Sequence, residues 1–335
     1  MSAAAAARGP TCWVLSEGMA GTENQCLALA AALGLAPEIK RAAARLPWRW
    51  LGPGMAAVAP QFLARGRDSL APPWPDLVIA GGRKCAGLAL AIQRASRGQS
   101  FTVFVQNPRL GQARFDLIVA PRHDGIAGDN VYTTRGALSR VGAAALGAAA
   151  AEFAPAFAAL PRPLAACMIG GASRRHRLTE AGGRGLGEAL AKLSAKSGCG
   201  LLITPSRRTP GLSFAALEAA LAGAPAYIWR GEGANPYLGF LALADAILVT
   251  ADSVSMVSDA CASAKPVYIL PVAGRRSARF ARFFAALEGE GAVRPFAGKL
   301  ESWSYAPLND CAEAADEIRR RMEMRKTAQQ TGRRV

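Results

Sequence analysis

Three serines and an aspartate open a predicted helix directly after an apolar run. The run "AILVTA" ends at Ala251, and Ser253, Ser255, Ser258 and Asp259 follow it. A serine at a helix start caps the helix with its hydroxyl and contributes about 1 kcal/mol. One cap explains one serine, whereas three hydroxyls and an acid also suit a phosphate with an attached ribose. Helix capping and ligand binding therefore both account for this stretch.

Cations and glycines follow two other apolar runs in the same half of the chain. They are Gly170, Gly171, Ser173 and Arg174 after "LAACMI", and Arg207 and Arg208 after "GLLITP". Arginine forks match phosphate oxygens bidentately. Each arginine by itself is more often a solvated surface residue, but together with the serines they predict a diphosphate site.

The first apolar run of the chain is also followed by a glycine-containing loop, "SEGMAGTENQ". Gly18 and Gly21 permit backbone conformations closed to other residues and let a ligand approach closely. Glu23 and Asn24 then fall in the first turn of the next predicted helix. A tight strand-to-helix turn explains the same glycines without a ligand.

Two further loops offer polar side chains for a sugar or an acceptor. In "GEGANPYLG", Asn235 and Tyr237 are candidate contacts to a base or sugar, although turn formation explains the glycines around them. His123, in "PRHDG", titrates near neutrality and is the candidate general base. Asp124 is its neighbour in sequence, but adjacent residues of a strand point to opposite faces, so no dyad is inferred.

Several chemistries lack their motifs in this chain. No DxD, HExxH or clustered His/Cys set is present, so no metal site is predicted. The GxGxxG of a nicotinamide-binding Rossmann domain is absent, which argues against an epimerase that uses such a cofactor. No GxSxG elbow for hydrolysis occurs either.

The elements that position these residues repeat one unit along the chain. A short β-rich run, a loop with Gly or Pro and an Ala/Leu-rich helical stretch follow one another in both halves. The runs are apolar on both faces, as strands of a buried parallel sheet must be. The predicted fold class is α/β, with two doubly wound parallel-sheet lobes.

The 335 residues suit two domains of ordinary size. The predicted divisions are a disordered terminus over 1–10, a first lobe over 11–160, a second lobe over 161–302 and a C-terminal helix with a basic tail over 303–335 that crosses back to the first lobe. The apolar stretch over 141–160 carries Glu152 and Pro155, so it is expected to pack between lobes and not to span a membrane.

The net charge of +16 calls for an anionic partner. Nucleic acid is disfavoured because no aromatic-interleaved platform, zinc finger or RNP-like motif is present. Phosphorylated ligands and an anionic membrane surface fit, and a solvated helix end also explains the basic tail. The seven cysteines are odd in number with no CxxC pair, which favours free thiols in a reducing compartment.

The stretch from Ser253 through Asp259 to Pro266 resembles the nucleotide-sugar signature of GT-B glycosyltransferases. "IGGASRR" is similarly like the glycine-rich first loop of their donor lobe. Asp259 stands where that group has a ribose-binding glutamate. The resemblance implies two Rossmann-like lobes facing a cleft, a donor site in the second lobe, and an acceptor side that includes the loop from Gly18 to Asn24.

A closer resemblance covers nearly the whole chain. "WVLSEGMAGTENQ", "PDLVIAGGRK", "FVQNPRL", "TPSRRTP" and "GEGANPYLGFLALADAILVTADSVSMVSDA" are similar to the mitochondrial fission "elongated mitochondria" family. Its plant member is a peripheral outer-membrane protein that recruits a dynamin-related GTPase, and its bacterial members have been labelled nucleoside-diphosphate-sugar enzymes. The Ala- and Arg-rich composition here suggests a bacterial protein.

The sequence thus leads to two hypotheses. The first is a metal-independent glycosyltransferase without a cofactor, whose substrate is a nucleotide sugar, expected to be a UDP-sugar, and whose acceptor could be lipid-linked. The second is a non-catalytic scaffold or membrane-peripheral protein that recruits a protein partner such as a dynamin-like GTPase. Either protein is expected in the cytoplasm, with the inner face of the membrane as a further location.

Overall fold

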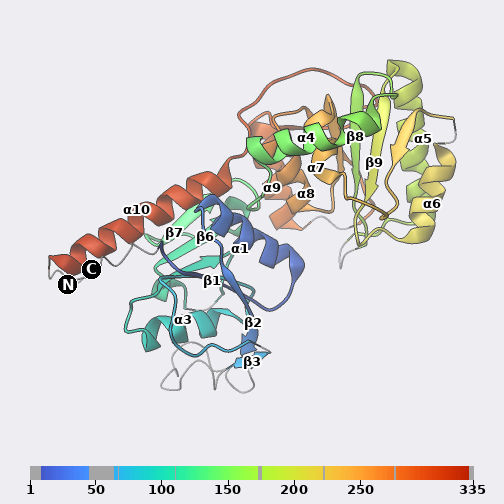
Figure 1. Cartoon of the computed structure of the whole chain (residues 1–335). Helices are drawn as coiled ribbons and strands as arrows, with labels where there is room; N and C mark the ends of the chain where they lie inside the picture. Colours follow the sequence, from blue (N-terminus) through green and yellow to red (C-terminus); the bar gives the residue numbers. More distant parts are fainter. Residues whose placement is uncertain are drawn as a thin grey trace. The chain divides into compact units, whose positions relative to one another are not determined.

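The computed structural model describes residues 9–44, 64–66, 68–109, 111–172, 176–221, 223–274 and 277–331, with the backbone alone at 64–66. The chain divides into two compact units (Figure 1). The first lobe comprises Met1–Arg140 together with Asp310–Val335, and the second lobe comprises Val141–Asn309.

The first lobe is built on a sheet of order β3-β2-β1-β4-β5-β6-β7, parallel except where β3 pairs antiparallel with β2. Its strands are β1 (Cys12–Ser16), β2 (Glu38–Ala44), β3 (Ala64–Gly66), β4 (Leu77–Gly81), β5 (Phe101–Val105), β6 (Leu117–Pro121) and β7 (Val131–Thr134). Its helices are α1 (Ala20–Ala32), α3 (Ala86–Ala95) and α10 (Asp310–Gln330), with 3-10 turns η2 (Gln112–Arg114) and η3 (Arg122–Asp124). One face of the sheet packs on α1 and α10, and the other packs on α3.

The second lobe is built on an all-parallel sheet of order β10-β9-β8-β11-β12-β13. Its strands are β8 (Leu164–Ile169), β9 (Gly200–Pro205), β10 (Ala226–Ile228), β11 (Ala246–Thr250), β12 (Val267–Leu270) and β13 (Val293–Pro295). Its helices are α4 (Ala143–Phe157), α5 (Glu180–Ser197), α6 (Gly211–Ala220), α7 (Tyr237–Leu243), α8 (Val254–Ala262) and α9 (Ala278–Gly289). Helices α5 and α6 cover one face, and α4, α7, α8 and α9 cover the other.

Both sheets are wound in two directions from a central strand. The chain runs from β1 to β2 on one side and then to β4 on the other, and likewise from β8 to β9 and β10 before it returns to β11. The strand order therefore reverses between β1 and β4 and between β8 and β11. Strands β1, β4, β5, β6, β8 and β11 are buried along their whole length, which requires side chains that are apolar on both faces. The predicted fold class, two doubly wound α/β lobes, is confirmed.

The division between the lobes falls at Val141, ahead of the position near residue 160 expected from the sequence. Helix α4 explains the difference because it packs on α7 of the second lobe. The rings of Phe157 and Phe240 lie 5.3 Å apart, and a Cβ on Gly239 would meet the Phe153 side chain at 2.8 Å. No helix in the described parts of the chain combines the length and the hydrophobicity needed to cross a membrane.

Helix α10 belongs to the first lobe although it follows the second in sequence. Ala314, Ala315 and Ile318 are buried in the same cluster as residues of α1 and β1. At its start, the Asp310 carboxylate accepts hydrogen bonds from the backbone N–H of Arg135 at 3.0 Å and of Gly136 at 2.8 Å. These contacts tie the C-terminal segment to the end of the first sheet.

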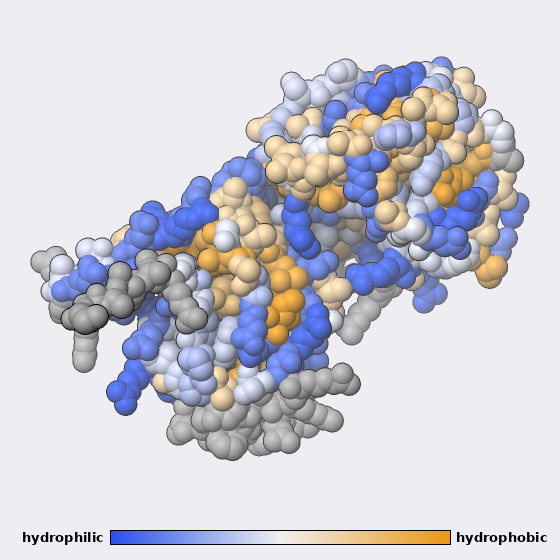
Figure 2. All heavy atoms as spheres, in the orientation of Figure 1, coloured by the Kyte–Doolittle hydropathy of each residue, from blue (hydrophilic) through white to orange (hydrophobic). Residues whose placement is uncertain are grey.

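The exposed side of α10 is hydrophilic, as Figure 2 shows along the helix. Its charges pair within the helix: Arg320 bonds to Glu317 at 2.7 Å, and Arg319 bonds to Asp316 at 2.7 Å. The bonds from Arg320 and Arg321 lower the pKa of Glu317 to about 2, against the opposing effect of burial. Much of the basic charge of this segment is therefore matched by acids on its own helix.

Helices α5 and α6 approach closely because glycine faces the contact. A Cβ on Gly183 would lie 1.9 Å from the Ser213 carbonyl oxygen, and one on Gly187 would lie 2.4 Å from that of Leu217. Gly185, on the same helix, has nothing within 4 Å of an added Cβ. The glycines of α5 therefore divide into those that permit the packing and those that do not touch it.

This division predicts opposite effects of two identical substitutions in one helix. Gly183→Ala should destabilise the protein by about 1 to 3 kcal/mol, because the methyl group overlaps the α6 backbone. Gly185→Ala should stabilise it by about 0.5 to 1 kcal/mol, because the helix loses a glycine and gains no clash. Urea unfolding of both variants measures the difference, and equal effects would contradict the packing described.

Candidate functional site

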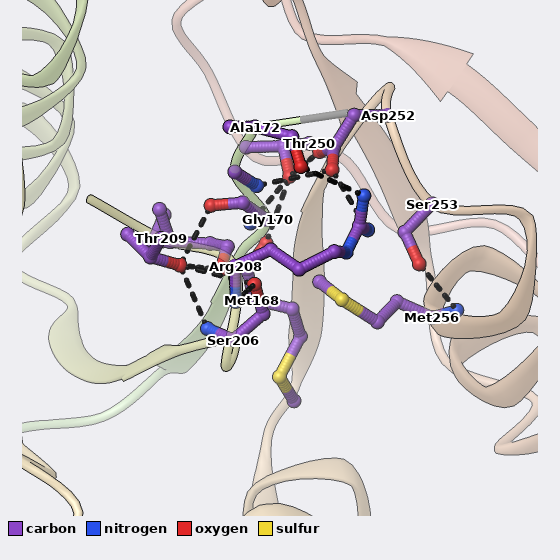
Figure 3. Close-up of polar contacts among 12 residues, drawn as sticks. Met168, Gly170, Ala172, Ser206, Arg208, Thr209, Thr250, Asp252, Ser253 and Met256 are labelled. Atoms are coloured by element: carbon purple, nitrogen blue, oxygen red, sulfur yellow. Dashed lines mark hydrogen bonds and ion pairs between the residues drawn. The ribbon is translucent and has the colours of Figure 1, made fainter. Parts of the chain in front are cut away.

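The polar residues of the second lobe gather where its strand order reverses. Three loops meet at the carboxyl ends of β8, β9 and β11 (Figure 3). They contribute Gly170 to Ala172, Ser206 to Thr209 and Thr250 to Ser253. Ligands of open α/β sheets bind at this kind of position because neighbouring loops diverge there.

A buried carboxylate, that of Asp252, connects all three loops. Its Oδ1 accepts a hydrogen bond from the Thr250 hydroxyl at 2.7 Å. Its Oδ2 accepts from the backbone N–H of Gly171 at 3.0 Å and from Arg208 Nη2 at 3.1 Å. The side chain of Asp252 is 0% exposed, whereas that of Arg208 is 43% exposed. The acid thus holds the arginine from inside, and the guanidinium faces outward.

Gly170 and Gly171 provide space in this arrangement. A Cβ on Gly170 would lie 2.0 Å from Asp252 Oδ1, and one on Gly171 would lie 2.0 Å from the Arg208 carbonyl oxygen. Their N–H groups already donate within the site, since Gly170 N–H bonds to the Thr250 hydroxyl at 2.7 Å and Gly171 N–H bonds to Asp252. Both N–H groups are therefore engaged within the lobe in this conformation, and phosphate binding by this loop stays a prediction.

The loop after β9 is fastened to the loop after β8 by one threonine. The Thr209 hydroxyl lies 2.7 Å from the carbonyl oxygen of Gly170 and 2.9 Å from that of Ile169, and it accepts from the N–H of Ser206 at 2.8 Å. Arg208 Nη1 also donates to the Ala172 carbonyl at 3.4 Å. These bonds determine where the backbone of Arg208 lies relative to β8.

The three serines of α8 have three different roles. Ser253 caps the helix, with its hydroxyl accepting from the N–H of Met256 at 3.4 Å. The Ser258 hydroxyl is buried and donates to the Val254 carbonyl at 2.9 Å. Ser255 is exposed in the first turn. The groups that can face an anion here are therefore the start of α8, Ser255, Arg208 and the exposed Arg207.

Asp259, Tyr237 and Asn235 come together from α8 and the start of α7. The Tyr237 hydroxyl donates to Asp259 Oδ2 at 2.9 Å, and the N–H of Tyr237 donates to Asn235 Oδ1 at 3.0 Å. Burial and, secondarily, the nearby Asp259 carboxylate raise the pKa of Tyr237 well above its usual value. The phenol therefore stays protonated and remains a donor to the acid.

The other predicted residues lie elsewhere. Ser173 and Arg174 fall outside the described residues. In the first lobe, Gly18 has φ +83° and donates its N–H to the Ser16 hydroxyl at 2.9 Å. Gly21 and Asn24 are exposed on α1, while Glu23 is buried beside Arg41. Glu23 accepts from Arg41 Nη2 at 2.7 Å and from Nε at 3.1 Å.

His123 lies in the 3-10 turn η3, after β6, and its side chain is only 1% exposed. Its Nε2 is 3.9 Å from Asp124 Oδ1, so the turn brings together two neighbours that a strand would separate. A substrate hydroxyl would need access to the imidazole, which is buried in this conformation. Its role as a general base stays a prediction.

Sequence reasoning missed Asp252, Thr250 and Thr209. Asp252 stands two residues after the last residue of β11. From the sequence, ligand binding in this stretch was attributed to the serines that follow and to Asp259, so Asp252 was passed over. The available signal was a carboxylate two residues after a buried strand. Among the described residues, no group of three His, Cys, Asp or Glu side chains is arranged to hold a metal ion.

A family comparison decides the chain's relationships. The family described as mitochondrial fission ELM1 matches residues 20–322. The chain belongs to the mitochondrial fission ELM1 family. It is 37% identical over 278 residues to the mitochondrial fission protein ELM1 of Arabidopsis thaliana, an alignment that covers 75% of this chain and 65% of that protein. An uncharacterised Rickettsia prowazekii protein is 26% identical, with 94% of this chain and 99% of that protein covered.

Solved structures of other proteins share the fold of this ELM1 family member. The UDP-GlcNAc 2-epimerase of Methanocaldococcus jannaschii has a TM-score of 0.55 at 13% identity, covering 92% of this chain and 98% of that one. A putative UDP-N-acetylglucosamine 2-epimerase of Listeria monocytogenes has a TM-score of 0.52 at 13% identity, covering 93% and 88%. The GT-B-like fold is thereby confirmed.

The bonds of Asp252 predict that its amide analogue is tolerated better than its removal. Asp252→Ala should destabilise the protein by about 2 to 3 kcal/mol, because buried donors lose their acceptor. Asp252→Asn should cost about half of that: its amide oxygen can still accept from Gly171 and Arg208. The Thr250 hydroxyl can then turn to the Met168 carbonyl, 3.5 Å away. Urea unfolding compares the two variants, and an equal loss would contradict this hydrogen-bond arrangement.

The Glu23–Arg41 pair predicts a dependence of stability on pH. The hydrogen bonds from Arg41 lower the pKa of Glu23 below its usual value of 4.5, although burial acts in the opposite direction. A lowered folded-state pKa stabilises the protein above the unfolded pKa, and that stabilisation is lost as pH falls through the folded value. The stability difference between wild type and Glu23→Gln should therefore be present at pH 7 and shrink below pH 4.5. A pH-independent difference would contradict it.

Proposed function

We propose that the second lobe binds a nucleoside diphosphate sugar where its strand order reverses, and that the protein transfers the sugar to an acceptor. The observation that supports this most is the convergence of Arg208, Ser255 and the start of α8 at one edge of the sheet. Asp252 and Thr209 hold Arg208 there from inside. A uridine diphosphate sugar is the proposed donor.

The electrostatics of this edge suit a diphosphate. The start of α8 carries a partial positive charge of roughly half an elementary charge, and its first N–H groups point out of the helix. A guanidinium has several N–H donors in a fixed fork, and the bonds to Asp252 and Ala172 use two of them. The remaining donors are available to phosphate oxygens, and the exposed Arg207 adds a second cation.

The Asp259–Tyr237 pair is the proposed contact for the ribose. A carboxylate has two oxygens and accepts several hydrogen bonds, so the bond from Tyr237 at 2.9 Å leaves capacity for vicinal hydroxyls. The phenol orients the acid before the ligand arrives. Asn235, which accepts from the N–H of Tyr237, fixes the start of α7 beside it.

Transfer of the sugar leaves negative charge on the departing diphosphate. Positive groups that are already in place stabilise such charge without reorganisation. In this proposal Arg208, Arg207 and the start of α8 supply that stabilisation, and no metal or organic cofactor is required. An acceptor hydroxyl also needs a base, for which His123 of the first lobe is the candidate.

A second function follows from the family itself. The Arabidopsis relative is named a mitochondrial fission protein, which would fit a non-catalytic role in recruiting a protein partner, such as a dynamin-like GTPase, or in binding an anionic membrane surface. Such a protein would keep the fold without using the second-lobe edge for nucleotides. Nucleotide binding therefore distinguishes the two functions.

The donor site predicts selective loss of nucleotide binding. Arg208→Lys keeps a cation that can pair with Asp252 but loses the planar fork, so the affinity for uridine diphosphate should fall about tenfold. Isothermal titration calorimetry measures it. The matched control is Arg184→Ala, which removes an exposed arginine of the same lobe that pairs with Glu180.

A base-selective response of the wild type in a screen of uridine, guanosine, adenosine and cytidine diphosphates would identify the donor. Saturating ligand at about 100 times its Kd should stabilise the fold by roughly 2.7 kcal/mol. Wild-type protein that binds none of these nucleotides would refute the donor site and favour the recruiting role.

A further inference from the structure

The first lobe combines the same three kinds of group as the second-lobe site, an acid, a glycine pair and a cation, although the acid and the glycines have exchanged strands. Its strand order reverses between β1 and β4. An acid, Glu17, follows β1, and a glycine pair, Gly81 and Gly82, closes β4 and follows it. A Cβ on Gly82 would lie 2.5 Å from Glu17 Oε1, just as a Cβ on Gly170 would meet Asp252. In both lobes a carboxylate therefore occupies space that only glycine leaves open.

The acid of the first lobe also holds a cation from inside. Lys84 Nζ lies 2.8 Å from Glu17 Oε2, with the Glu17 side chain 10% exposed and the Lys84 side chain 43% exposed. The Lys84 carbonyl accepts from the N–H of Ala44 at 3.1 Å, which fixes the loop after β4 against the end of β2. The ammonium group thus faces outward from a fixed backbone, as the guanidinium of Arg208 does.

At this edge of the first sheet the cations are exposed to solvent, whereas most of the acids are shielded from it. Four exposed cations follow the carboxyl ends of β4, β5 and β6: Arg83, Lys84, Arg109 and Arg122. A fifth, Arg41, lies within β2. The acids that accompany them face inward, with side chains of Glu17, Glu23 and Asp124 that are 10%, 11% and 6% exposed. A half-buried Asp68 bonds to the N–H of Arg41 at 2.6 Å. Solvent at this edge therefore meets mainly cations.

The opposite edge is mixed in charge, because the exposed Arg97 and Arg114 precede β5 and β6, and Arg325 pairs with Asp116 at 3.1 Å. Asp76 and Asp116 stand directly before β4 and β6, at the amino ends of these strands. What distinguishes the carboxyl edge is that its cations are exposed while the acids beside them are mostly shielded from solvent. This is an edge where the strand order reverses, and its exposed cations stand beside acids that are mostly buried. These are the features of an anion-binding site.

We propose that the carboxyl edge of the first lobe binds the phosphate group of a second ligand, with Lys84 and Arg83 as its contacts. Glu17 is a positioning residue, because it holds Lys84 and touches no ligand. This site goes beyond the proposed donor site, which lies in the second lobe, and it does not involve His123. The two sites give the protein one phosphate-binding edge in each lobe.

The loop beside Lys84 indicates how the ligand's source can be tested. Met19 follows Gly18, after Glu17, and its side chain is 62% exposed. An exposed apolar side chain next to a cationic edge suits a phosphate that carries a hydrocarbon chain. Pyrophosphate probes the phosphate group itself, while farnesyl diphosphate and uridine diphosphate distinguish a lipid-linked from a nucleotide source.

Calorimetric titration of the full chain with pyrophosphate tests the site. The double variant Arg83→Gln/Lys84→Gln should lose about tenfold in affinity at one site, equivalent to about 1.4 kcal/mol. Lys84→Arg keeps a cation at this position and should retain most of the wild-type affinity for pyrophosphate. Glu17→Gln leaves Lys84 in place but no longer positions it, so it should lower this affinity by a smaller factor than the double variant does. The control Arg94→Gln, at the far end of the helix that follows this loop, should change nothing.

Each outcome separates this site from the second-lobe site. Arg208→Lys should leave the Lys84-dependent binding intact, and the Arg83→Gln/Lys84→Gln variant should leave uridine diphosphate binding by the second lobe intact. Pyrophosphate affinity within twofold of wild type in the double variant would overturn the proposal. So would an equal loss in Arg94→Gln, since the effect would then reflect net charge alone. Tighter binding of farnesyl diphosphate than of pyrophosphate, lost in Met19→Ser, would assign a lipid-linked source.

Discussion

The packing of a buried carboxylate against glycine at each reversal of strand order is the contact on which both candidate sites depend. Asp252 occupies the space beside Gly170, and Glu17 occupies the space beside Gly82. A larger residue at either glycine would push Asp252 out of its hydrogen bonds or Glu17 out of its ion pair with Lys84. Since a buried acid is costly unless it is paired, each one draws in a cation and fixes it at the surface.

This constraint makes the sites rigid from within. Arg208 and Lys84 reach outward from backbones that are themselves bonded across loops, through Thr209 and through the bond from Ala44 to Lys84. A long cationic side chain ordinarily loses rotamer freedom when it binds an anion. Pairing with an internal acid removes part of that loss before a ligand arrives, which is how preorganisation raises affinity.

Neither the family nor the fold of this protein identifies the reaction it performs. Membership in the mitochondrial fission ELM1 family describes what the chain resembles over residues 20–322, and the fold neighbours describe how such a chain is wound. Family membership and fold similarity therefore leave the reaction open. The chemistry has to be argued from the groups that face solvent at the sheet edges, because the same doubly wound lobe supports many functions.

Sequence alone predicted α/β lobes with parallel sheets, because strands that are apolar on both faces and alternate with helices need helices to cover both faces of the sheet. It also located the helix start at Ser253, where a local cap is readable from residue types. Only the tertiary structure decided which donors remain for a ligand. The N–H groups of Gly170 and Gly171, two residues of the predicted diphosphate site, donate to Thr250 and Asp252. These partners lie 80 and 81 residues away, so they meet only because β8 and β11 are neighbours in the sheet, and strand order is not encoded in any local pattern.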